Sequence, residues 1–120
     1  MDAAPDPRIA WTIAEMKRAI AQPLRVADFA RAVNLAPSRF SVLFRSHTGC
    51  SPARYLRTLR LDEARRLLEH TFLSVKEVMA LVGYNDPSHF TRDFSRFHGT
   101  APSRVRGTQV LFETVDSPPT

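Results

Sequence analysis

Arginine dominates the chemistry available to this sequence of 120 residues. Of its 17 Lys and Arg side chains, 15 are Arg, and they outnumber 12 Asp and Glu for a formal net charge of +5. The guanidinium group is planar, always charged and donates hydrogen bonds in a fixed fork that matches phosphate oxygens and the edge of guanine. Residues 36–106 hold 12 cations and six acids, whereas residues 107–120 hold two acids and no cation. The basic excess therefore belongs to the body of the chain and favours a polyanionic partner.

His47 and Cys50 are the other pair with chemical potential. They form a His-x-x-Cys pair, but no second pair of ligands accompanies it, so we expect no metal and no cofactor. A Cys–His nucleophile would need an orienting carboxylate and a substrate pocket, and neither is evident. The sequence therefore predicts a protein that is not an enzyme. Its single cysteine cannot form an internal disulfide, which points to the cytoplasm.

The composition predicts one all-helical domain. Hydrophobic residues make up 43% and charged residues 24%, as in ordinary globular proteins. There are only four Gly and no Asn-Gly or Asp-Gly turn, and apolar residues recur at intervals of three and four. No apolar run approaches the roughly 18 to 20 residues of a membrane span, and the N-terminus lacks the features of a signal peptide. We therefore expect a soluble protein without a membrane partner.

The first part of the chain predicts a leader and one helix. Residues 1–7, with two Pro and two Asp, are expected to form a flexible leader. A helix is expected from about residue 8 to 21, and Pro23 ends it. Its inward stripe consists of Ile9, Ile13, Met16 and Ile20. Trp11 lies off this stripe, so it either covers a neighbouring helix or stays partly exposed.

An internal repeat organises the remainder. Residues 24–35 match residues 73–84 at an offset of 49, and beyond the turn the offset becomes 50. The later matches pair Pro37, Ser38, Phe40, Phe44, Gly49 and Pro52 with Pro87, Ser88, Phe90, Phe94, Gly99 and Pro102. Each copy predicts a short helix, a turn, and a second helix that Pro opens and Gly ends. This is the pattern of a helix-turn-helix unit.

Capping signals differ between the two copies. Ser74 with Glu77 predicts a capping box, and Asp86 is expected to cap the helix that follows it. The corresponding positions in the first copy are Arg25 and Ala36, which cannot cap through their side chains.

A long helix is expected to join the copies. Ser51 should cap it, Pro52 should open it, and it should run over residues 52–70 with an ion pair such as that between Asp62 and Arg66. A short helix at about 102–106 and a tail over 107–120 complete the chain.

Residues 9–106 resemble the DNA-binding domain of the AraC/XylS family of bacterial transcription regulators, which consists of two helix-turn-helix units joined by a long helix. The run from Arg60 to Leu68 is similar to the linker helix of that family. The run from Val82 through Ser88-His89-Phe90 and Phe94 to Gly99 and Pro102 is similar to its C-terminal signature. The sequence departs from the family at Asn34, Ala36 and Met79. The resemblance implies about seven helices in a domain over 8–106, with a first unit at 8–50, the linker at 52–70 and a second unit at 73–106.

The resemblance also implies that the second helix of each unit enters the major groove of DNA. Together with helical phase, it places toward the bases Ser38, Arg39, Ser41, Val42, Ser88, His89, Thr91 and Arg92. Arg39 and Arg92 are candidates for guanine, and Val42 for a thymine methyl group. Candidates for phosphate are Arg45, Ser95 and Arg96. The side chains of Phe40, Leu43, Phe44, Phe90, Phe94 and Phe97 are expected to face the core.

The prediction is therefore sequence-specific binding of double-stranded DNA for transcriptional regulation, with one recognition helix per unit in adjacent major grooves. The 19 residues of the linker would span about 28 Å, against about 34 Å between successive grooves on one face of DNA. We expect the protein to bind as a monomer if the chain is complete, and RNA polymerase or other transcription machinery to be a second partner. The alternative is a helical protein-interaction module without DNA specificity, with Val110, Leu111 and Phe112 as its contact segment.

Overall fold

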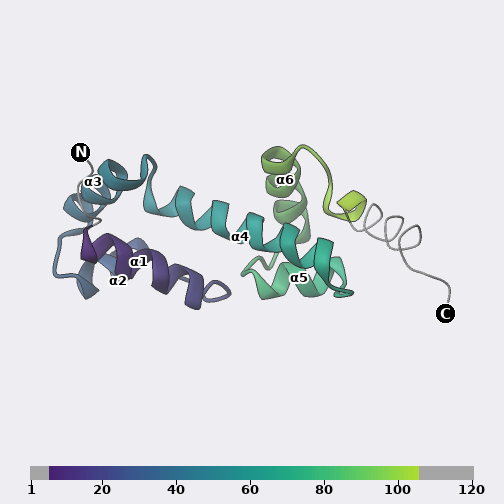
Figure 1. Ribbon diagram of the computed structural model, residues 1–120, viewed down its shortest axis with the longest axis horizontal. Coiled ribbons are helices and arrows are strands. Elements are labelled where there is room, and N and C mark those ends of the chain that lie inside the picture. Colours follow the sequence, from purple (N-terminus) through teal and green to yellow (C-terminus); the bar gives the residue numbers. More distant parts are fainter. Residues whose placement is uncertain (1–5, 106–120) are drawn as a thin grey trace. The chain divides into compact units, whose positions relative to one another are not determined.

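The computed structural model of the chain describes residues 6–105, and the elements in that range are helical. Six helices follow one another as α1 (Pro7–Arg18), α2 (Val26–Ala32), α3 (Pro37–Thr48), α4 (Pro52–His70), α5 (Val75–Leu81) and α6 (Pro87–His98) (Figure 1). A further helical turn covers 102–105. The all-α prediction is confirmed. No described helix is both long and apolar enough to cross a membrane, and the apolar segment at 110–112 lies outside the described residues.

The chain divides into two compact units between Leu59 and Arg60, so α4 contributes to both. The core of the first unit consists of Ile9, Met16, Phe29, Ala30, Phe40, Phe44 and Leu56. Here α3 packs against α1 and α2, because the fully buried rings of Phe40 and Phe44 project from one face of α3. The ring of Tyr55 in α4 meets Phe44 edge to face at 5.4 Å. This core fixes the orientation of α3.

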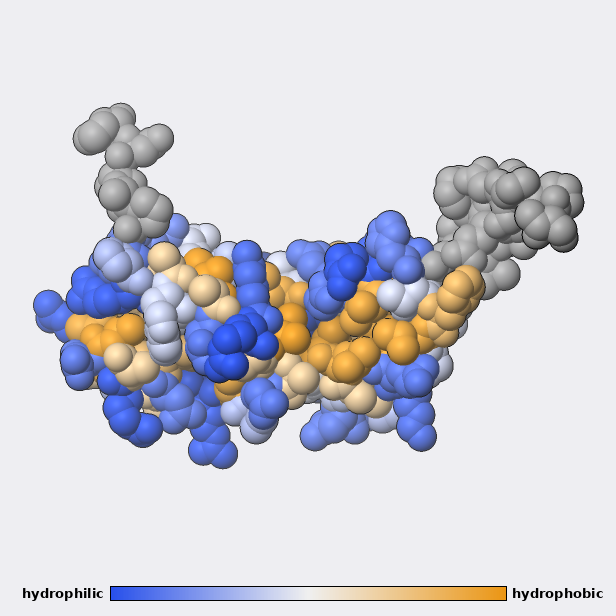
Figure 2. Space-filling model, turned by 60° about the horizontal axis from the view of Figure 1, so that its bottom comes forward, coloured by the Kyte–Doolittle hydropathy of each residue, from blue (hydrophilic) through white to orange (hydrophobic). Residues whose placement is uncertain are grey.

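The second unit has its own core. Leu61, Ala64 and Leu68 of α4 belong to it together with Val78, Met79, Val82, Tyr84, Phe90, Phe94 and Val105. Phe90 and Phe94 are fully buried, with ring centroids 5.6 Å apart, as the helical periodicity predicts. Elsewhere apolar side chains reach the surface among hydrophilic ones (Figure 2). Trp11, which is 44% exposed, is one of them.

The prediction that Phe97 faces the core is wrong, because its side chain is 45% exposed. The inward stripe of α6 follows Phe90 and Phe94 at a spacing of four, and the next position belongs to His98. The imidazole of His98 lies 4.5 Å from the ring of Phe94 and forms a hydrogen bond with the carbonyl of Leu61 over 2.8 Å. A polar side chain thus occupies the inward position and ties α6 to α4.

The first helix differs from its predicted bounds at both ends. It begins at Pro7, because the carboxylate of Asp6 accepts a hydrogen bond from the backbone N–H of Arg8 over 2.8 Å and caps it. Asp6 and Pro7 are therefore part of the folded unit and do not belong to a leader. The helix ends at Arg18, where Ala19 leaves the helical conformation and its carbonyl accepts from Gln22 N–H in a turn before Pro23.

The predictions made for helix caps are confirmed. The side chains of Ser51 and Asp86 accept from backbone N–H groups at the starts of α4 and α6. Arg25 and Ala36 make no side-chain cap, and Gly49 and Gly99 end α3 and α6 at positive φ.

In the turn between α2 and α3, Asn34 adopts φ of 63° where the second unit has Gly83 at 91°. Asn tolerates this left-handed conformation better than most residues, so the departure from glycine there preserves the turn.

The expected ion pair between Asp62 and Arg66 is not the one formed. Arg66 instead binds Glu63 one turn away over 2.7 Å, and Arg65 binds Glu69 over 3.0 Å. Pairs at i,i+3 and i,i+4 are both within reach on a helix, so sequence spacing alone does not choose between them.

Replacing Ser74 with Ala is expected to lower the free energy of unfolding by about 1 kcal/mol. The hydroxyl of Ser74 accepts from Glu77 N–H over 3.0 Å, and the Glu77 carboxylate accepts from Ser74 N–H over 2.8 Å, so the change removes half of a complete capping box. In the first unit Arg25→Ser should instead raise this free energy by a few tenths to about 1 kcal/mol. Chemical denaturation measures the free energy of unfolding of both variants. An unchanged denaturation midpoint for Ser74→Ala would contradict a stabilising role for the capping box.

Candidate nucleic-acid interface

One face of α3 is polar and cationic. Ser38, Arg39 and Arg45 are exposed, and Ser41 is half-buried. Val42 lies on the same face with 71% of its side chain exposed, so it contributes almost nothing to the core. Since Phe40 and Phe44 hold the opposite face, the predicted residues of the first unit are brought together on one exposed surface. The helix contains no acidic residue.

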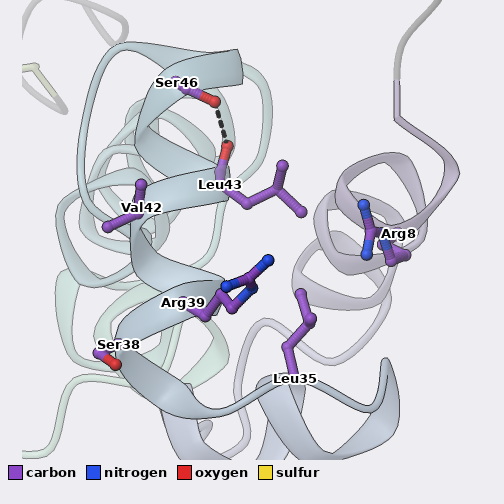
Figure 3. Close-up of a pocket in the computed structure, with 7 residues that line it drawn as sticks. All are labelled: Arg8, Leu35, Ser38, Arg39, Val42, Leu43 and Ser46. Carbon is purple, nitrogen blue, oxygen red and sulfur yellow. Dashed lines mark hydrogen bonds between the residues drawn. The ribbon is translucent and has the colours of Figure 1, made fainter.

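Two adjoining hollows flank this face of α3. The larger, of about 590 Å³, lies between α1 and α3 and is lined by Arg8, Leu35, Ser38, Arg39, Val42, Leu43 and Ser46 (Figure 3). The second, of about 440 Å³, is lined by Ser41, Val42, Arg45, Ser46 and Ser51. Val42 and Ser46 border both. Of the predicted residues, Ser38 and Arg39 line the first hollow, Ser41 and Arg45 line the second, and Val42 lines both.

In the second unit α6 presents the equivalent face. Ser88, Thr91, Arg92 and Arg96 are exposed, and Ser95 is half-buried, while the buried Phe90 and Phe94 hold the other side. The structure therefore groups the predicted residues of the second unit as well.

His89 has contacts that its sequence position does not reveal. Its Nε2 lies 3.2 Å from Asp93 Oδ2, and the same oxygen accepts a hydrogen bond of 2.9 Å from the hydroxyl of Tyr84. The rings of Tyr84 and His89 meet edge to face at 5.5 Å. The i,i+4 spacing on a helix signals the His89–Asp93 pair, but no local pattern signals Tyr84, which reaches Asp93 across the turn. The side chain of His89 is half exposed, and its buried side contacts Asp93 and Tyr84 of the same unit.

The two faces differ at equivalent positions of the repeat. At the offset of 50, Arg39 corresponds to His89 and Val42 corresponds to Arg92. The first exposed guanidinium of the helix, at Arg39 in α3 and at Arg92 in α6, therefore lies one helical turn later in α6. The two recognition faces therefore carry different side chains at equivalent positions of the repeat.

A pair of helix-turn-helix units, each with a cationic, hydroxyl-bearing face on its second helix, defines the class of double helix-turn-helix proteins. The chain belongs to the AraC-type helix-turn-helix family. The sequence model of this family, which is described as a helix-turn-helix domain, matches residues 29–108.

Two similar proteins are bacterial transcriptional regulators. The HTH-type transcriptional regulator CdhR of Pseudomonas aeruginosa is 32% identical over 112 residues, which cover 93% of this chain and 33% of the relative. The regulator GbdR of the same species is 31% identical over 109 residues, 91% of this chain and 30% of the relative. This chain thus spans about a third of the length of the curated relatives it matches.

Two solved structures share the fold. The DNA-binding domain of AdpA, a global transcriptional factor solved in complex with a target DNA, superimposes with a TM-score of 0.81 at 26% identity, covering 98% of this chain and all of that one. An AraC-type transcriptional regulator from Chromobacterium violaceum gives a TM-score of 0.79 at 26% identity, covering 86% of this chain and 92% of that one.

Proposed function

We propose that this chain binds double-stranded DNA sequence-specifically and serves as the DNA-binding part of a transcription regulator. The observation that carries the proposal is the exposed row of guanidinium groups and hydroxyls on α3 and on α6, each held outward by a buried pair of Phe side chains. Family membership and the likeness to the DNA-bound domain of AdpA support it.

In this proposal, residues in the first two turns of α3 and of α6 contact the bases. Arg39 and Arg92 donate bidentate hydrogen bonds to guanine, and Val42 packs on a thymine methyl group, at about 1 to 3 kcal/mol of discrimination for each good bidentate pair. Hydroxyl contacts to base edges come from Ser38, Ser41, Ser88 and Thr91. His89 contributes through Nδ1, because Nε2 faces Asp93.

Phosphate contacts fall to Arg45, Ser95 and Arg96, which lie further along each helix. Such contacts set the register of the protein on DNA and carry no direct sequence information. They also make the affinity depend strongly on salt, because each neutralised phosphate releases counterions.

The proposed organisation is a first unit that ends at residue 50 and begins with the Asp6 cap of α1, a linker helix at 52–70 and a second unit at 73–106, followed by a tail. We propose that a single chain occupies one asymmetric DNA site through both recognition helices, that RNA polymerase or other transcription machinery is a further partner, that the protein acts in the cytoplasm, and that it has no enzymatic activity.

The test begins with selection of a preferred duplex from a random library. The affinity of the chain for this duplex is then measured over a range of salt concentrations. We expect log K to fall linearly with log salt at a slope of about −0.9 per phosphate contacted. Arg92→Ala should relax the preference at one base step of the second half-site by about 1 to 3 kcal/mol. Arg96→Ala should weaken all duplexes alike and reduce the slope by about one.

Fluorescence anisotropy on matched and mismatched duplexes separates these effects. If Arg92→Ala selected the same DNA motif as the wild-type chain and bound it with the same affinity, the proposed contact of Arg92 with a base would be wrong. Failure of the chain to select any motif, with binding that barely responds to salt, would instead favour a protein-interaction module.

A further inference from the structure

Arg8 lies next to the proposed DNA-binding face although it belongs to neither helix of the first helix-turn-helix. It stands in the first turn of α1, and its side chain lines the same hollow as Arg39 and Ser38 at the start of α3 (Figure 3). The two guanidinium groups project into this hollow from different helices. Leu35 and Leu43 give the hollow an apolar lining. Cationic groups beside apolar surface suit a sugar–phosphate strand, whose phosphates are anionic and whose deoxyriboses are largely apolar.

Asp6 holds Arg8 in this position. Its Oδ1 lies 3.1 Å from Nε and its Oδ2 lies 2.8 Å from Nη2, which makes a bidentate pair. Two of the five guanidinium N–H donors are engaged in this way. Hydrogen bonds from the Arg8 side chain and backbone hold the pKa of Asp6 at about 2, so both groups are charged at neutral pH. The pair orients the guanidinium, and the carboxylate also offsets part of its charge.

We propose that Arg8 binds a phosphate of the DNA strand that flanks the bases contacted by α3, and that Asp6 orients Arg8 while weakening its attraction for that phosphate. The inference rests on the proposed DNA binding and deepens it. It extends the interface of the first unit beyond the helix-turn-helix to α1. The sequence alone places residues 1–7 in a leader and assigns Arg8 no function.

Arg18 provides a matched control on the same helix. It forms an ion pair with Glu15 at i,i+3, its side chain is 71% exposed, and it does not line the hollow. Arg8→Gln and Arg18→Gln therefore remove the same charge from the same unit and break the same kind of ion pair. Any difference between them reports position and not net charge.

The experiment measures the affinity of the full chain for its selected duplex by fluorescence anisotropy at several salt concentrations. Arg8→Gln is expected to reduce the salt slope by about 0.9 and to weaken binding by roughly tenfold at low salt. Arg8→Lys, which keeps the charge, should retain the wild-type slope. Arg18→Gln should change the slope by well under half as much as Arg8→Gln.

Asp6→Asn tests the second part of the proposal. Asn keeps a side-chain oxygen that can cap α1, so the helix start is preserved while the negative charge is lost. Binding should tighten by about two- to fivefold, mostly at low salt, as expected for a charge at the rim of an interface. Circular dichroism checks that each variant retains the wild-type helix content.

The outcomes separate the inference from the proposed function. If Arg8→Gln and Arg18→Gln give the same slope, or if Arg8→Lys loses the slope as Arg8→Gln does, the phosphate contact is wrong while DNA binding stands. If Asp6→Asn leaves affinity unchanged or weakens it, the role of Asp6 as a competing charge is wrong. If the wild-type chain shows no salt-dependent binding to any duplex, the proposed function itself fails.

Discussion

Replacing Phe94 with Ala is expected to unfold the second unit while the first unit stays folded. The side chain of Phe94 is fully buried between Phe90 and His98, with ring centroids at 5.6 and 4.5 Å. Truncation of a buried Phe to Ala costs about 3 to 5 kcal/mol, which is a large part of the roughly 5 to 15 kcal/mol that stabilises a whole domain. The buried residues of the two units form separate clusters, so the cost falls on one of them.

Hydrogen exchange measured by mass spectrometry is the appropriate readout. We expect the amides of α5 and α6 to lose most of their protection in Phe94→Ala, and those of α2 and α3 to keep theirs. Phe44→Ala is the matched variant, because Phe44 holds the equivalent, fully buried position of the first unit and should give the opposite pattern. Equal loss of protection in both units from either variant would show that the two cores unfold as one.

Proline at position 59 is expected to abolish most of the advantage that a complete DNA site has over a half-site. Leu59 lies inside the unbroken helix α4, at the last position of the first unit. Proline there removes the backbone hydrogen bond to the carbonyl four residues earlier and clashes with it, at about 3 kcal/mol or more. Linked binding modules gain about 10²- to 10⁴-fold in affinity when the connection allows both to engage. A broken helix should lose much of that gain.

Leu59→Ala is the control for this experiment, because it removes the packing of a partly buried side chain and keeps the helix. Full-site and half-site duplexes are compared by anisotropy, and footprinting shows which half-sites each variant protects. The proposal of coupled binding by one chain would be wrong if folded Leu59→Pro still protected both half-sites with native affinity. It would also be wrong if the native chain bound only as a symmetric dimer.

Features encoded within one or two helical turns were predictable from the sequence. The spacing of Phe90 and Phe94 predicts a buried stripe, and the helix period of 3.6 residues forces them onto one face. Ser74 with Glu77 predicts a capping box because both partners lie within four residues of each other. The internal repeat predicts two units of similar design, and the exposed faces of α3 and α6 follow from the same periodicity.

Contacts between segments far apart in the chain were decided only by the tertiary structure. Periodicity places His98 on the same face of α6 as Phe94, but only the tertiary structure brings the carbonyl of Leu61, 37 residues away, within hydrogen-bonding distance of its imidazole. Tyr84 reaches Asp93 because the turn before α6 brings them together, and this contact defines how His89 is held. Arg8 shares a hollow with Arg39 because α1 packs on α3. Helical periodicity specifies which face of a helix is buried, but it does not specify which side chain of another helix lies opposite, and that pairing depends on the packing of the whole unit.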